Sequence, residues 1–146
     1  MDYETSRTLD VAADMFRDSF AVLHDMQQRN VLCDMELKIG TRSLLCHKVV
    51  LCSTSKYFRV MFTNQMRESR SSIVELKELD ANAVESLVTF AYTGKIVIHI
   101  DDVQALFHAS SFLQFDTVAA ACSDFMRQQL HPSNCIEMRK FAEQNG

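Results

Sequence analysis

The fold is decided by residues 33–62, which read CDMELKIGTRSLLCHKVVLCSTSKYFRVMF. Within 33–39 the odd positions are apolar and the even positions are charged, and a period of two indicates a half-buried strand. Residues 40–42 form a turn, and residues 43–46 can return as the partner strand of a hairpin. From 47 to 62 the apolar spacing is helical. Ser53, Thr54 and Ser55 are expected to divide it into two short helices, because serine and threonine compete for backbone groups.

Before this stretch, the spacing predicts a helix over about 11–28, with Asp10 as a candidate N-cap. Its apolar face includes Ala12, Phe16, Phe20 and Leu23. Such a face is ordinarily covered by the chain's own core. Its length and its position ahead of the strand favour a partner surface in another molecule.

After the stretch, the sequence predicts a polar loop, a strand over 73–77, and a helix that Asp80 caps and Gly94 ends. A β-branched run predicts a further strand over 95–100. We expect an Asp101/Gln104 capping box and an Asp116 cap to open the next two helices. A last helix begins near 135 and has an apolar face with nothing after it. We therefore expect the chain to be the N-terminal piece of a longer protein.

The composition fits one globular domain: 146 residues are 47% hydrophobic and 23% charged. Only three Gly and one Pro are present, which favours helices and excludes a glycine-rich phosphate loop. The net charge of −4 without a basic stripe makes nucleic acid an unsuitable direct partner. No secretory leader or membrane-spanning run is evident, so we expect no membrane partner and a cytoplasmic location, with the nucleus left open. The predicted class is α+β, a small sheet flanked by a cluster of helices.

Several linked motifs resemble the BTB/POZ signature. They are CDMEL at 33–37, LCHKVVL at 45–51, SKYFRVMF at 55–62 and FAYTG at 90–94. HPSNC at 131–135 resembles the junction that leads into the BACK domain of kelch-like proteins. The resemblance implies a tail over 1–8 and a BTB/POZ domain over 9–130. Residues 131–146 would be the truncated start of a BACK domain, the region called the three-box.

Kelch-like proteins are adaptors of cullin-3 ubiquitin ligases, so the resemblance implies a non-enzymatic, dimeric adaptor that binds the cullin-3 N-terminal domain. A C-terminal kelch domain would recruit the substrate protein. The family's hydrophobic-x-Glu motif falls on Met66 and Glu68. The cullin-binding residues implied are Val60, Met61, Met66, Glu68, Phe115 and Cys135.

The resemblance also implies that the N-terminal helix dimerises, through Ala12, Phe16, Phe20 and Leu23. It places Asp34 and Lys48 in the family's charged pocket. From the residues alone these two charges are either solvated or a partly buried ion pair, and a structural and a binding role stay equally open.

Two other classes of function are weighed against the adaptor. A BTB dimerisation module of a transcription regulator would bind co-repressor peptides in a groove between subunits. A thiol hydrolase has little support, because no orienting third residue can be nominated. Cys46-His47 with Cys52 lacks zinc-ligand spacing, so we expect neither a metal nor another cofactor.

Overall fold

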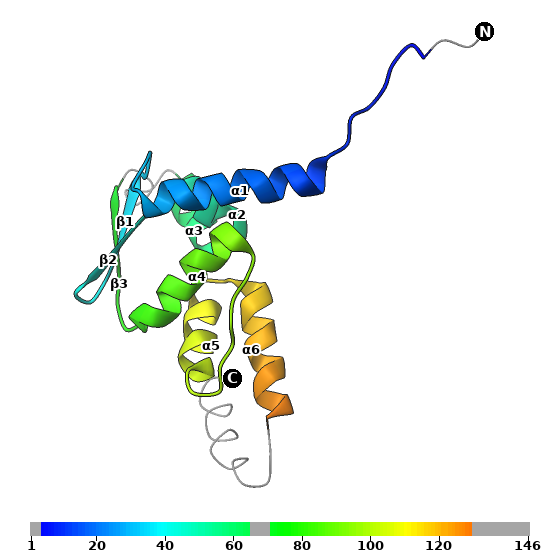
Figure 1. Cartoon of the computed structure of the whole chain (residues 1–146). Helices are drawn as coiled ribbons and strands as arrows, with labels where there is room; N and C mark the ends of the chain where they lie inside the picture. Colours follow the sequence, from blue (N-terminus) through cyan, green and yellow to red (C-terminus); the bar gives the residue numbers. More distant parts are fainter. Residues whose placement is uncertain (1–3, 65–70, 130–146) are drawn as a thin grey trace.

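The computed structural model describes residues 4–64 and 71–129 (Figure 1). The expected roles of Met66, Glu68 and Cys135 lie outside these residues, as do the predicted BACK junction and the last helix. The elements are α1 (Ala12–Gln28), β1 (Met35–Ile39), β2 (Arg42–Cys46), α2 (Lys48–Thr54), α3 (Lys56–Thr63), β3 (Ile73–Leu76), α4 (Ala81–Thr93), α5 (Val103–Phe112) and α6 (Asp116–Gln128).

The described strands form a sheet in the order β2-β1-β3. β1 and β2 are the predicted antiparallel hairpin, while β3 pairs parallel to β1 after a crossover through α2 and α3. Met35, Leu37 and Ile39 are buried and Lys38 is exposed, so the period of two is confirmed. The turn uses Gly40 at φ 61°, a left-handed conformation that favours glycine.

The predicted break between α2 and α3 falls at Ser55, which is fully buried. Its backbone is extended, and its Oγ accepts a hydrogen bond from the Phe58 N–H as the N-cap of α3. The same hydroxyl donates to the Leu113 carbonyl at the end of α5, with an O···O distance of 2.6 Å. Ser55 thus separates two helices and ties the second one to α5.

Both predicted ends of α4 are confirmed. The Asp80 carboxylate accepts from the Ala83 N–H at 2.9 Å, which satisfies one unpaired donor of the first turn. Gly94 ends the helix at φ 69°, and its N–H donates to the Phe90 carbonyl.

Four local predictions were wrong. Residues 95–99 form no strand, because no neighbouring strand in the described chain pairs with them. Asp102 rather than Asp101 is the N-cap of α5, and it makes no side-chain cap bond. Asp116 lies in the first turn of α6 instead of preceding it. Asp10 accepts from the Ala12 N–H, but Val11 is the N-cap position of α1.

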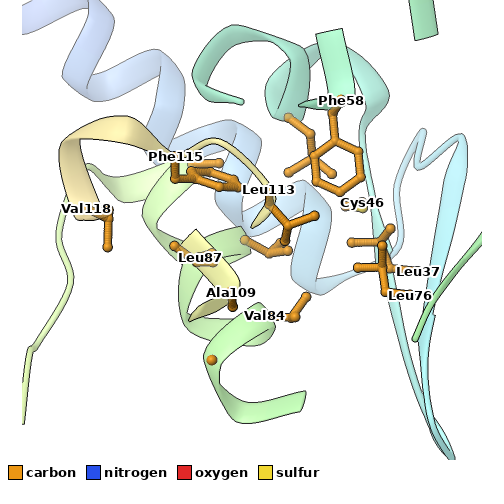
Figure 2. Close-up of a cluster of buried hydrophobic side chains, with 14 of the residues drawn as sticks. Leu37, Cys46, Phe58, Leu76, Val84, Leu87, Ala109, Leu113, Phe115 and Val118 are labelled. Carbon is orange, nitrogen blue, oxygen red and sulfur yellow. The ribbon is translucent and has the colours of Figure 1, made fainter. Parts of the chain in front are cut away.

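The core lies between the sheet and the helices. Side chains from β1 and β3, such as Leu37 and Leu76, converge with Val84 and Leu87 of α4 (Figure 2). α1 lies across this body and contributes no buried residue of its own, and its N-terminal half extends beyond the other helices (Figure 1). The core is therefore complete with α1 still largely uncovered.

Candidate interaction surfaces

The first candidate surface is the outer side of α3 where it meets α5. Val60 is 63% exposed there, while Met61 is half-buried against the core. Tyr57 of α3 contacts Phe112 at the end of α5, with ring centres 5.4 Å apart, and Phe112 is 50% exposed. We call Tyr57, Val60 and Phe112 the α3 face. Exposed aromatic and aliphatic side chains of this kind act as anchors in protein interfaces.

Charged side chains border the α3 face. The Lys56 ammonium lies 2.9 Å from the Asp116 carboxylate, joining the start of α3 to the start of α6. Arg59 donates to the Cys52 and Ser53 carbonyls at the end of α2. The apolar centre with a charged margin resembles the arrangement of a protein interface.

Phe115, expected among the cullin-binding residues, lies inside the core. Its side chain is 2% exposed and packs edge-to-face on Phe90, with ring centres 6.5 Å apart. Phe115 is therefore left out of the exposed α3 face, and its cullin-binding role stays a prediction. Phe112, three residues earlier, was not among the residues expected at a binding surface. The sequence signal that could have identified Phe112 was its position: an aromatic residue at the end of a helix, beside a predicted helix junction.

The second candidate surface is the exposed side of α1. Ala12 and Phe16 are exposed, and Phe16 retains 57% of its accessible surface. Met15 and Val22 are also about half exposed. Phe20 and Leu23 were expected on this surface but pack partly against the core. We call Ala12, Met15, Phe16 and Val22 the α1 face.

A groove of about 690 Å³ runs between α1 and the C-terminal end of α4. Phe16, Phe20 and Phe90 supply apolar lining, and Arg17 and Lys95 also line it. In this groove the Thr54 hydroxyl is a buried polar atom without a hydrogen-bond partner. Apolar side chains of α1 and of α4 therefore line this groove together.

Asp34 and Lys48 are joined through the backbone. The Asp34 carboxylate accepts from the Lys48 N–H at 2.8 Å, and Lys48 is the first residue of α2. His47, at the N-cap position, makes no side-chain cap bond. Asp34 therefore caps α2 from another segment, and its negative charge suits the helix N-terminus. The Lys48 ammonium lies 5.3 Å from the centre of the Phe62 ring.

The sequence match to a known family identifies the family to which this chain belongs. A family model described as the BTB/POZ domain matches residues 23–130. The chain belongs to the BTB/POZ family. The BTB domain of zebrafish PATZ1 matches this BTB/POZ domain with a TM-score of 0.76 and 26% identity, covering 85% of this chain and all of that one. The predicted fold is confirmed.

Kelch-like proteins are similar in sequence to this BTB/POZ domain. Kelch-like protein 17 from mouse, rat and human is 45% identical over 128 residues, which is 88% of this chain and 20% of the relative. Mouse Kelch-like protein 8 is 39% identical over 132 residues, covering 90% of this chain and 21% of that protein. The chain thus spans about a fifth of the length of these curated relatives.

The thiols of this BTB/POZ domain give little support to the hydrolase reading. Burial raises the pKa of Cys46 to about 12, and nearby Cys33 and Asp34 add to the shift. Burial likewise raises the pKa of Cys122 to about 11, and that of Cys33 and Cys52 above their usual range. A thiol nucleophile needs the opposite shift.

Within 4–64 and 71–129 no group of three His, Cys, Asp or Glu side chains is placed to hold a metal ion. In the same residues no helix combines the length and the apolar character needed to cross a bilayer.

Proposed function

We propose that this BTB/POZ domain is a dimeric, non-enzymatic adaptor module that binds the cullin-3 N-terminal domain within a substrate-recruiting ubiquitin ligase. Two findings support the proposal: family membership, and similarity to Kelch-like proteins over 88–90% of the chain. The observation that carries it is the presence of two separate exposed apolar faces, one on α1 and one on α3 with α5. An adaptor that is both paired and cullin-bound needs two such surfaces.

We propose the following division of the chain. Residues 1–8 are a tail, residues 9–130 form the BTB/POZ domain, and residues 131–146 begin a BACK domain. The family match ends at residue 130, which supports the boundary there. The substrate protein would be held by a kelch domain beyond this chain. We expect this adaptor to act in the cytoplasm, and the nucleus remains open.

The two faces would serve different contacts. The α1 face suits a second copy, because a two-fold dimer uses the same surface twice. The α3 face suits cullin-3, with Val60 and Phe112 as apolar anchors and Met61 as support beneath them. For Met66, Glu68 and Cys135 the proposal rests on the motif resemblance alone. Holding substrate and ligase together makes the transfer step effectively intramolecular, and two copies add avidity.

The test uses one variant for each face, so that each variant controls the other. Val60→Asp places a charge on the α3 face, and Phe16→Asp places one on the α1 face. For Val60→Asp we expect cullin-3 affinity to fall on the order of tenfold or more while the dimer persists. For Phe16→Asp we expect monomers that still bind cullin-3. Calorimetry with the cullin-3 N-terminal domain and light scattering measure the two effects.

The outcomes separate the competing functions. A complex of two copies of each chain supports the adaptor. A dimer that shows no binding to cullin-3 overturns the cullin assignment. In that case the candidate function becomes the transcription-regulator module, which would bind co-repressor peptides in a groove between the two subunits and for which Asp34 and Lys48 would matter most. If Val60→Asp and wild type bind cullin-3 equally, the α3 face is not the contact.

A further inference from the structure

The connection between α1 and β1 has an unusual backbone. Asn30 and Leu32 adopt φ values of 54° and 59°, in the left-handed region. Asn30 is readily accommodated there as the residue just after the C-cap of α1, where the Val31 N–H donates to the Met26 carbonyl at 2.8 Å, so the strain lies at Leu32. Leucine is disfavoured there because its Cβ crowds the backbone. The Leu32 side chain is also 79% exposed, so its own packing does not hold this conformation. Strained backbone of this kind persists only where surrounding contacts fix it.

The carbonyl side of Val31 is held by a buried histidine. The Val31 carbonyl lies 2.9 Å from the His47 Nε2, and His47 is only 7% exposed. The other ring nitrogen, Nδ1, lies 2.6 Å from the Tyr92 hydroxyl of α4. The backbone N–H of His47 donates to the same hydroxyl at 2.9 Å. His47 thus joins the α1–β1 connection to α4.

Counting donors and acceptors assigns the protons of this network. A carbonyl only accepts, so Nε2 must carry a proton to bond Val31. The Tyr92 oxygen accepts from the His47 backbone, and its single proton is then available for Nδ1. The Cys33 thiol, 3.9 Å from the Gln27 carbonyl and 3.8 Å from Nε2, fits the same arrangement as a donor to that carbonyl. With the ring proton on Nε2, each of these contacts has one donor and one acceptor.

We propose that His47, fixed in the Nε2–H form by Tyr92, is a clamp that holds the strained α1–β1 connection and so sets the direction of α1. We call His47, Tyr92 and the Val31 carbonyl the His47 clamp. Tyr92 reaches α1 as well, because its ring lies 5.8 Å from that of His24. Where the clamp is lost, the connection relaxes and α1 loses its fixed orientation over α4.

The clamp has a consequence for pairing, and this part rests on the proposed function. α1 carries the face proposed to meet a second copy. A helix held in one direction presents that face with less entropy to lose on association. We therefore expect the dimer dissociation constant to rise at least threefold when the Tyr92 hydroxyl is removed.

The primary test is the proton position on His47 at pH 7, read by long-range ¹H–¹⁵N correlation of the ring. The expected result is one proton, on Nε2. The second test is amide hydrogen exchange in Tyr92→Phe, which removes one oxygen atom. We expect the Val31 and Asp34 amides to exchange at least tenfold faster, with less than a twofold change in α6. His108→Gln, which changes an exposed histidine of α5, is the control and should alter neither.

A double variant tests the strain itself. Glycine tolerates the left-handed region, so Leu32→Gly should reduce the effect of Tyr92→Phe on Val31 exchange to less than threefold. The proposal is overturned by a proton on Nδ1, by exchange of Val31 unchanged within twofold, or by acceleration equal in α6, which would indicate global destabilisation. A wild-type chain that stays monomeric refutes the proposed dimer but leaves these tests of the clamp intact.

Discussion

Replacing Ser55 by alanine should be among the most damaging single changes in this domain, although it deletes one atom. The hydroxyl makes two hydrogen bonds in a fully buried position. It accepts from the Phe58 N–H at 3.1 Å, and it donates to the Leu113 carbonyl at 2.6 Å. Alanine removes both, because its methyl group neither donates nor accepts.

The magnitude follows from the two losses. Removing an N-cap costs roughly 0.5–2 kcal/mol. Leaving a buried carbonyl without its donor costs roughly 1–3 kcal/mol more. Since the two bonds share one atom, they do not simply add, and we expect about 3 kcal/mol in the free energy of unfolding. Whole domains are stable by only about 5–15 kcal/mol. The melting temperature should therefore fall by about 10 °C.

Urea unfolding at a fixed chain concentration measures the effect, because any dimer makes stability concentration-dependent. Ser53→Ala is the matched control two residues away. Ser53 is an exposed residue whose hydroxyl donates to the Val50 carbonyl at 2.6 Å. Because water can reach this part-buried site, loss of the hydroxyl should change stability by less than about 0.5 kcal/mol. If Ser55→Ala costs less than about 1 kcal/mol, or no more than Ser53→Ala, the reasoning from paired buried bonds is refuted.

Three further predictions follow from single contacts. Asp34→Ala should lower the free energy of unfolding by about 1 kcal/mol, and Asp34→Asn by less, because an amide oxygen still accepts from Lys48; thermal unfolding checks the order. Gly94→Ala should cost about 1 kcal/mol in urea unfolding, purely from its φ of 69°, since an added Cβ would meet nothing within 4 Å. The raised pKa values of Cys46, to about 12, and Cys122, to about 11, mean that the unfolded thiols ionise first. This contribution to stability is full below pH 9 and is lost as pH rises from 9 toward 12. In Cys122→Val the urea midpoint should therefore fall less steeply with pH over pH 8–10.5 than in the wild type. An unchanged slope would contradict the prediction.

The sequence was sufficient at β1 and at α4, where a local pattern met a local physical need, although the capping patterns at the starts of α1, α5 and α6 misplaced the N-cap. The alternation at 33–39 fixed which side of β1 is buried, and Asp80 with Gly94 marked both ends of α4. It was insufficient where the outcome depends on a neighbour. The β-branched run at 95–100 has the composition of a strand, but no strand of the described sheet lies beside it, and Val97 is 85% exposed.

The same limit explains the candidate surfaces. Phe112 and Phe115 are both aromatic and three residues apart, and only the packing of α5 and α6 leaves one exposed and buries the other. The charged pocket of Asp34 and Lys48 stays a prediction. The contact in the structure is the Asp34 carboxylate on the Lys48 backbone N–H, which side-chain charges alone do not reveal.

The contacts that shape the two faces also explain why the faces are separable. The α3 face is set by Ser55, which links the start of α3 to the end of α5. The α1 face is set from the other end of the core, through Val31, His47 and Tyr92. These two sets of hydrogen bonds share no residue. Damage to one is therefore expected to leave the other face in place, since changes at sites without shared partners act independently. Under the proposed function, we therefore expect the loss of one partner to leave binding of the other intact.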